Sequence, residues 1–276
     1  MRTSIFIILM FLCGKADATQ PKPEAVKAWD RYIALTEARV DAQQGDTKNF
    51  LYPSTESDGQ KTALEAKLKM GEIVVQKLQT TEDSKEIEAP GALIHHWMGT
   101  AFIEKGTIKQ AFAALQDYDH HSTTYAPEVQ RSKLISRGGD DFTAYLRFVK
   151  KKVITVVLDT YHQAHYGILD ATHAYSRSHT TKVAEIEDPG TPREREKSAD
   201  EDEGFMWKMN TYWRFEERDG GLYIQCEAVT LTRDVPFGLA WIIKPFITSI
   251  PKESLTSTMA ETRKALDDST RGASPH

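Results

Sequence analysis

The sequence contains very little cysteine, with only Cys13 and Cys226 among 276 residues. Cys13 lies in an N-terminal segment that we expect to be removed, so Cys226 would be the single thiol of the mature chain and no internal disulfide could form. An exported protein without disulfides must be stabilised by the packing of its core. A chain of this length with 40% hydrophobic residues can bury such a core.

Charge of one sign is also not concentrated anywhere along the chain. There are 35 Lys and Arg residues against 40 Asp and Glu residues, which gives a net charge of −5. Because the two signs are interspersed and no basic stripe is present, we expect no nucleic acid among the partners.

The motifs of common catalytic, nucleotide-binding and metal sites are absent. The sequence has no G-x-S-x-G, no P-loop, no G-x-G-x-x-G, no pair of neighbouring cysteines and no H-E-x-x-H. The acidic run Asp200–Glu203 lacks the alternating ligands and central glycine of a calcium loop. We therefore predict no catalytic residue, no metal and no cofactor.

The nine histidines do not form a metal-binding pattern. His95 and His96 are neighbours on a predicted strand, so their side chains point to opposite faces. The same alternation separates His162 from His165, which are three residues apart. His120-His121 follow a predicted helix and could meet a distant partner, although a solvated loop end also explains them.

No hydrophobic run is long and apolar enough to span a bilayer, and the N-terminal run Ile5–Leu12 is too short to do so. Arg2 precedes this run and Ala16-Asp17-Ala18 follows it, and together these are the three parts of a secretory signal. A buried first helix is the alternative interpretation. We expect residues 1–18 to be a signal peptide, cleaved near Ala18, and the mature protein to be secreted or periplasmic without a stable membrane span.

Patterning beyond the signal divides the chain into an extension and a main unit. Residues 19–89 show helical periodicity with polar loops, which predicts an N-terminal helical extension. Residues 90–268 behave as one unit of strands with a first and a last helix, and we expect residues 269–276 to be a disordered tail. Within the unit, residues 187–204 combine two prolines, two glycines and dense mixed charge, which predicts a solvated loop.

Two predicted hairpins sort their residues by face. A two-residue turn at Asp219-Gly220 would place Trp213 opposite Cys226 and Phe215 opposite Ile224. These four side chains share one apolar face, whereas Arg214 and its alternate neighbours share a polar one. The other hairpin turns about Gly138-Gly139 and repeats this alternation, with four apolar residues on one face: Phe142, Ala144, Leu146 and Phe148.

The last predicted helix is the natural cover for that apolar face. It runs from about Lys252 to Asp268, with Leu255, Met259 and Leu266 at helical spacing. The three prolines that precede or begin it are expected to break the chain into short segments that fold aromatic side chains onto the sheet: Pro236, Pro245 and Pro251.

Two segments resemble a known superfamily. They are "LQDYDHHSTTYAPEV" (Leu115–Val129) and "LTRDVPFGLAWIIKPFITSIPKESLTSTMAETRKAL" (Leu231–Leu266). These segments, and the order of the predicted strands and helices, resemble the START-like (SRPBCC) helix-grip proteins. That superfamily includes lipid-binding domains, polyketide cyclases, coenzyme Q-binding proteins and plant pollen allergens. The resemblance implies an α+β fold in which a curved antiparallel sheet of about six to seven strands wraps around a long C-terminal helix. It does not cover the N-terminal extension or the charged loop.

The resemblance further implies a hydrophobic ligand between the sheet and the last helix. It would be a lipid, quinone, sterol or polyketide. The side chains expected to line its site are Trp97, Leu146, Phe148, Trp213, Phe215, Ile224, Phe237, Trp241 and Met259. The alternative is that they pack against one another without a cavity. A polar set could contact the ligand's head group, or could be exposed to solvent: Tyr145, Arg147, Tyr161 and Arg214.

Three functions are compatible with these features. The first is a secreted or periplasmic carrier of a hydrophobic molecule, which needs no catalytic group. The second is an enzyme of the polyketide cyclase or hydrolase type on the same scaffold, which needs a polar cluster inside the cavity. The third is a protein-interaction module, which predicts a filled interior and an exposed apolar patch. The oligomeric state is left open.

Overall fold

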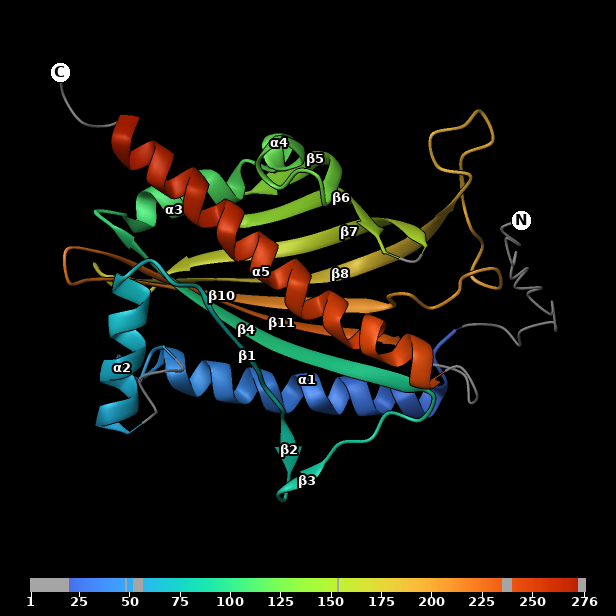
Figure 1. The fold of residues 1–276 in the computed structure, drawn as a ribbon, viewed down its shortest axis with the longest axis horizontal. Coiled ribbons are helices and arrows are strands. Elements are labelled where there is room, and N and C mark those ends of the chain that lie inside the picture. The colour runs from blue at the N-terminus through green and yellow to red at the C-terminus, as the bar shows by residue number, and fades with distance from the viewer. Residues whose placement is uncertain (1–19, 48, 52–56, 153, 235–239, 273–276) are drawn as a thin grey trace, which may run out of the picture.

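One antiparallel sheet forms the centre of the structure, a computed structural model that describes residues 20–47, 49–51, 57–152, 154–234 and 240–272. The long helix α5 crosses one face of this sheet, and α1 runs along the other (Figure 1). We call these the α5 face and the α1 face. The helices are α1 (Pro23–Gln44), α2 (Asp58–Lys69), α3 (Ile108–Gln116), α4 (His121–Thr124) and α5 (Ala240–Gly272), with a 3₁₀ turn at Tyr118–His120.

Eight strands form the hydrogen-bonded path of the sheet. In spatial order they are β1 (Val74–Lys77), β4 (Ala92–Glu104), β11 (Gly221–Arg233), β10 (Lys208–Arg218), β8 (His173–Glu187), β7 (Thr155–Ile168), β6 (Asp141–Lys151) and β5 (Val129–Gly138). The short β9 (Arg195–Glu196) pairs with β8, and β2 (Thr81–Glu82) pairs with β3 (Lys85–Glu86) in a separate hairpin. The α+β class is confirmed, and the sheet exceeds six to seven strands because β1 of the extension joins its edge.

The pairing of β10 with β11 confirms the predicted hairpin. The register places Trp213 opposite Cys226 and Phe215 opposite Ile224. The backbone φ is +57° at Asp219 and +76° at Gly220, which is the left-handed geometry of a two-residue turn that matches strand twist. The other hairpin turns one residue later than expected, at Gly139-Asp140, because Gly138 already pairs with Asp141.

Bulges interrupt two strand pairs in the half of the sheet that is distant from β1: β5 with β6, and β7 with β8. The register shifts between Leu134 and Ser136 in β5, and between Tyr161 and His162 where β7 meets β8. A bulge bends its strand and increases the local twist. The sheet can therefore curve around α5, as the helix-grip fold requires.

The start of α5 differs from the prediction. The helix begins at Ala240 and continues through Pro245 and Pro251, so these prolines do not divide the chain into short segments. Each proline removes one backbone hydrogen bond of the helix. Farther along α5 the helix packs closely on the sheet: a Cβ at Gly99 of β4 would lie 2.7 Å from Cγ of Met259.

The predicted first helix of the main unit is confirmed as α3. Thr107 caps it, since the backbone N–H of Gln110 donates to the Thr107 hydroxyl at 3.2 Å. The side chains of Ile108, Ala111 and Leu115 face the sheet. Helix α3 and the C-terminal half of α5 thus cover the same end of the α5 face.

Candidate functional site

The α5 face is densely packed beneath α3 and the C-terminal half of α5. The rings of Trp213 and Phe215 are stacked with centroids 6.1 Å apart, and Phe112 of α3 meets Phe215 edge-on at 5.6 Å. Leu255 and Met259 of α5 are buried in the same cluster. Nothing in this cluster distinguishes it from an ordinary hydrophobic core.

The remainder of the α5 face is less completely covered. Strand alternation places a group of half-buried side chains there, with apolar members in the majority: Trp97, Leu146, Phe148, Met209, Thr211 and Ala228. Lys252 of α5 lies over the Trp97 ring at 5.7 Å, and Glu253 pairs with Lys152 at 2.5 Å. This turn of α5 therefore reaches from β4 to the loop after β6, across the half-buried group.

The residues predicted to bind the ligand divide between these two regions. Four of them belong to the packed cluster: Trp213, Phe215, Ile224 and Met259. Three belong to the half-buried group: Trp97, Leu146 and Phe148. Phe237 and the side chain of Trp241 lie outside the described residues. The half-buried group is the part of the α5 face where an apolar molecule could cover side chains that the protein leaves partly uncovered.

The predicted polar set lies on the opposite side of the sheet. Arg147 is 5% exposed and binds both oxygens of Asp159, at 2.6 and 2.7 Å, while Tyr145 donates to the same carboxylate at 2.8 Å. Arg214 is completely buried under α1 and pairs with Glu227 at 2.8 Å. The two arginines are therefore not solvent-exposed, and they do not face α5. Tyr161, also on this side, is half-buried beneath the ammonium group of Lys182.

Glu227 is the centre of an ionic cluster between the sheet and α1. It is completely buried and accepts hydrogen bonds from Arg214, from His96 at 2.7 Å and from Arg39 of α1. Burial on its own raises the pKa of Glu227, but the hydrogen bond from His96 and the charges of His96, Arg39 and Arg214 lower it to about 2. Burial lowers the pKa of Arg214 to about 10, so both groups are charged at neutral pH. This cluster holds α1 against the sheet.

Three buried histidines lie on the α5 side and were not among the predicted site residues: His95, which bonds to Thr232 at 3.0 Å, His121 and His162. His162 of β7 is 4% exposed and His121 of α4 is 6% exposed. Burial is the main cause that lowers the pKa of each to about 4, so both are neutral at pH 7. The alternation of side chains along β6 and β7 could have predicted that His162 lies on the same face as Leu146. No feature of the sequence predicts that His121 lies on this side of the sheet.

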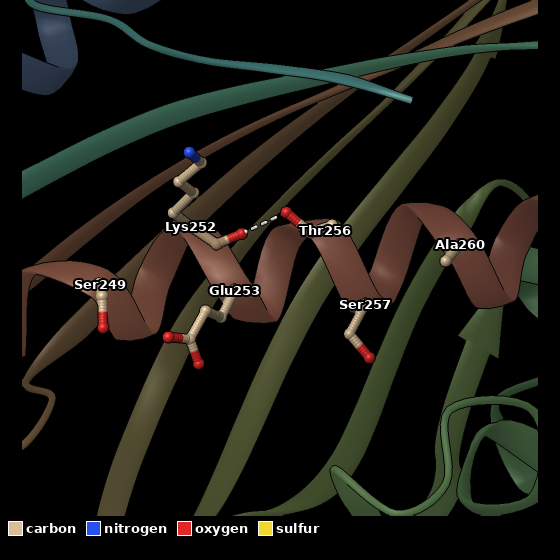
Figure 2. A pocket seen from close by; sticks show the side chains of 6 residues that line it. All are labelled: Ser249, Lys252, Glu253, Thr256, Ser257 and Ala260. Carbon is tan, nitrogen blue, oxygen red and sulfur yellow. Dashed lines mark hydrogen bonds between the residues drawn. The ribbon is translucent and has the colours of Figure 1, made fainter. Parts of the chain in front are cut away.

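A surface depression of about 570 Å³ runs along α5 (Figure 2). All of the residues that line it in the described part of the chain belong to α5: Ser249, Lys252, Glu253, Thr256, Ser257 and Ala260. Thr256 and Lys252 are exposed, and the Thr256 hydroxyl donates to the Lys252 carbonyl at 2.8 Å. The depression includes Lys252 and Glu253, which belong to the turn of α5 that reaches across the half-buried group.

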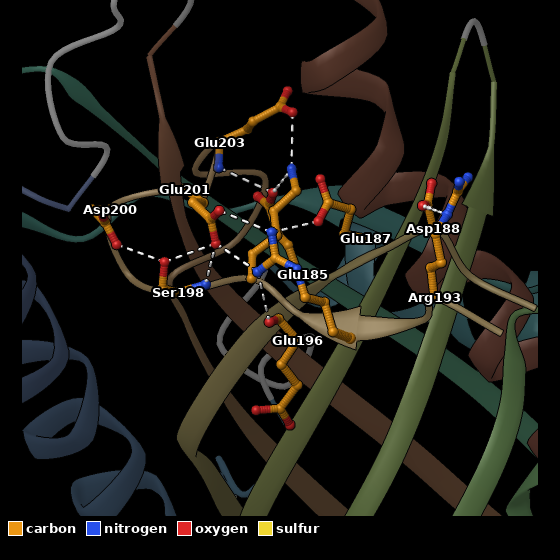
Figure 3. A network of polar contacts seen from close by, with 11 residues as sticks. Glu185, Glu187, Asp188, Arg193, Glu196, Ser198, Asp200, Glu201 and Glu203 are labelled. Atoms are coloured by element: carbon orange, nitrogen blue, oxygen red, sulfur yellow. Dashed lines mark hydrogen bonds and ion pairs between the residues drawn. The ribbon is translucent and has the colours of Figure 1, made fainter. Parts of the chain in front are cut away.

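The charged loop predicted at residues 187–204 is tied to the sheet by ion pairs (Figure 3). Lys197 binds Glu185 at 3.1 Å and Glu203 at 2.9 Å. Asp202 is buried, and its burial and the nearby charge of Glu185 raise its pKa to about 7. Within the described residues, no group of three or more His, Cys, Asp or Glu side chains is arranged to hold a metal ion.

Comparisons with known proteins give structural similarity without sequence similarity. No family model and no curated protein matches the chain. Among solved structures, it is similar to a STAR-related lipid transfer protein from Xanthomonas axonopodis (12% identity, 68% of this chain and 98% of that one, TM-score 0.42). It is also similar to human STARD10 (10% identity, 77% and 80%, TM-score 0.42). A third is the di-domain ARO/CYC protein StfQ from the steffimycin biosynthetic pathway (12% identity, 66% and 53%, TM-score 0.43).

The predicted α+β arrangement of the helix-grip fold, an antiparallel sheet crossed by a long C-terminal helix, is confirmed by the strand order of this chain and by the position of α5 across the sheet (Figure 1). Among the helices of the described residues, none combines the length and the hydrophobicity needed to cross a bilayer.

Proposed function

We propose that this chain is a binding or carrier protein for a hydrophobic small molecule, held on the α5 face of the sheet beneath α5. The observation that carries this proposal is the half-buried apolar group beside a fully packed core. Each CH₂ group moved from water into such a site contributes about 0.8 kcal/mol to binding. A ligand over Trp97, Leu146 and Phe148 would complete the burial that the protein leaves unfinished.

Catalysis is a weaker explanation of the same site. An enzyme of the cyclase or hydrolase type needs a base whose pKa is close to the working pH. Burial lowers the pKa of both His121 and His162 to about 4, which makes each imidazole a poor base at pH 7. These groups suit the recognition of a ligand better than proton transfer.

A protein-interaction module is also less well supported. The large apolar side chains exposed in the described residues are spread over four segments of the chain: Met70, Ile135, Ile154, and Ile168 with Leu169. A docking surface would gather them on one face.

We further propose that the protein acts outside the cytoplasm. Residues 1–18, on which this proposal rests, lie outside the described residues. The test is N-terminal sequencing of the protein recovered from the periplasm or medium of an expression host. A new N-terminus next to Ala18 supports export, and a mature chain that keeps Met1–Ala18 overturns it.

Ligand binding is tested by native mass spectrometry of the purified protein followed by organic extraction. We expect one apolar molecule per chain, or uptake of one fatty acid, quinone or fluorescent hydrophobe by the extracted protein. Leu146→Trp should reduce uptake because the larger ring occupies the site, whereas Ile168→Trp, at an exposed strand end, should not. A chain that is isolated empty and takes up none of these molecules would overturn the proposal.

A further inference from the structure

Three hydroxyl side chains lie together on the α5 face, on the central strands of the sheet. Thr211 of β10 is paired with Ser178 of β8 on one side and with Ala228 of β11 on the other. Thr230 follows two residues after Ala228 and therefore lies on the same face of β11. We call Ser178, Thr211 and Thr230 the hydroxyl cluster. Thr211 and Ala228 belong to the half-buried group, and Ser178 and Thr230 are half-buried as well, so the cluster lies within the proposed ligand site.

The hydroxyl cluster has more protons to donate than hydrogen bonds that use them. Oγ of Ser178 and Oγ1 of Thr211 are 2.7 Å apart, and only one of the two hydroxyls can donate across this contact. The other keeps its proton without an acceptor among the described residues. Oγ1 of Thr230 is buried and has no hydrogen-bond partner in the part of the chain that the structure describes. Two donors are therefore left over, and a buried polar group without a partner requires an explanation.

The side chains beside the hydroxyl cluster offer no charge to a ligand. The residues paired with the cluster on the neighbouring strands are Met209, His95, Ala164 and Ala228. Burial is the main cause that lowers the pKa of His95 to about 4, so its imidazole is neutral at pH 7. A neutral acceptor therefore costs less to place here than an anion, which would be buried without a counter-charge.

We propose that the hydroxyl cluster donates hydrogen bonds to a carbonyl oxygen of an otherwise apolar ligand. This inference rests on the proposed carrier function and names the chemical class of its ligand. A carbonyl oxygen has two lone pairs, so it can accept from Thr230 and from the Ser178–Thr211 pair at once. Thr211 and Thr230 are diagonal neighbours on adjacent strands. Such neighbours are about 7 Å apart, which two hydrogen bonds of about 2.8 Å to one shared oxygen can span. Ketones, quinones and esters carry the required oxygen.

Three probes test this proposal: dodecan-2-one, 2-methyldodec-1-ene and dodecan-1-ol. The alkene has the shape of the ketone, with a CH₂ group in place of the carbonyl oxygen. Dodecan-1-ol, whose hydroxyl can donate as well as accept, is the reference ligand for the carrier function. Dissociation constants are measured from the fluorescence of Trp97 and the other tryptophans.

Variants of nearly the same shape remove the donors. Thr230→Val and the double variant Ser178→Ala/Thr211→Val should each weaken the binding of the ketone by about 5-fold, because each removes one hydrogen bond. Neither should weaken the binding of the alkene. Thr143→Val, on the opposite face of β6, is the matched control and should bind both probes as the wild-type protein does.

The infrared spectrum of the bound ketone needs no variant to fold. A carbonyl group that accepts hydrogen bonds absorbs at a lower frequency than the same group in an alkane. We expect the carbonyl stretch of dodecan-2-one bound to the wild-type protein to lie below its value in hexane. In Thr230→Val it should move back toward that value.

The outcomes separate this proposal from the carrier function. A bound ketone whose carbonyl absorbs as it does in hexane overturns the carbonyl proposal. Ketone binding that both variants leave unchanged, or weaken no more than they weaken alkene binding, also overturns it. In either case the carrier function stands if dodecan-1-ol or the alkene binds. Failure of all three probes to bind the wild-type protein overturns the carrier function and the carbonyl proposal together.

Discussion

Buried polar groups on the two faces of the sheet differ in charge. On the α1 face, Arg214 and Glu227 are charged, fully buried and paired with each other. On the α5 face, His121 and His162 are buried but neutral, and Nε2 of His121 has no hydrogen-bond partner in the described residues. Paired charges fix one arrangement of the chain, whereas an unused polar atom leaves a bond for another molecule to make. The paired charges of the α1 face stabilise the fold, whereas the α5 face is where we propose that a ligand binds.

Removing the carboxylate at the centre of the α1 face should have the largest effect. Glu227→Ala leaves Arg214 buried without its counter-charge, which we expect to lower the free energy of unfolding by about 3–5 kcal/mol. Urea denaturation at pH 7.5 measures this change.

The double variant Arg214→Met/Glu227→Met provides the control for that experiment. Replacing both charges with apolar groups should cost less than removing one of them. If the double variant is less stable than Glu227→Ala, the charge pair is not what makes the single variant costly.

Substitutions in the two parts of the α5 face should affect stability and ligand uptake differently. Phe215→Ala opens a void in the packed cluster and should lower the free energy of unfolding by about 3–5 kcal/mol. Phe148→Ala removes a half-buried ring, so it should cost only about 1–2 kcal/mol while weakening ligand uptake.

Urea denaturation and the dodecan-1-ol titration, applied to both variants, test this separation. If Phe148→Ala destabilises the protein as much as Phe215→Ala and leaves uptake unchanged, the α5 face is one continuous core.

The sequence predicts contacts between neighbouring segments better than contacts between segments that are far apart in the chain. The hairpin of β10 and β11 was predictable down to its residue pairs, because a two-residue turn fixes the register. The burial of Arg214 was not, because the helix that covers it comes from a segment about 170 residues earlier in the chain. The onset of α5 at Ala240 was hidden by Pro245 and Pro251, which locally oppose a helix.

Acid should weaken the α5 face before it weakens the α1 face. The pKa of His162 is lowered to about 4 in the folded protein, chiefly by burial, so the unfolded chain binds a proton first as the pH falls below 6.5. Stability is then lost between pH 6.5 and 4, by about 2 kcal/mol from this residue at pH 5. Glu227, with its pKa lowered to about 2, stabilises the fold above pH 4.5 and loses that contribution only as the pH falls toward 2.

Unfolding of the wild-type and His162→Phe proteins at pH 8 and pH 5 isolates this effect. Asp202 acts in the opposite direction, because its raised pKa of about 7 makes the folded state take up a proton as the pH falls through 7. Since Asp202 is present in both proteins, the difference between them reports His162. An equal loss of stability in both would show that His162 is protonated in the folded state.

Substitution of an exposed ion pair should have the smallest effect. Arg193 pairs with Asp188 in the charged loop, and its side chain is 82% exposed. Arg193→Ala should change the free energy of unfolding by less than about 0.5 kcal/mol. A much larger loss, measured by the same urea denaturation, would mean that the loop contributes to the core of the fold.

Photolabelling tests the central claim most directly. The purified protein is irradiated with a dodecanol that carries an alkyl diazirine, and the labelled peptides are identified by mass spectrometry. If an apolar ligand lies on the α5 face, the label should concentrate on the peptides that contain Trp97 and Phe148, and an excess of dodecan-1-ol should suppress it. Labelling confined to α1 or to exposed strand ends, or labelling that dodecan-1-ol does not suppress, would contradict the proposed site.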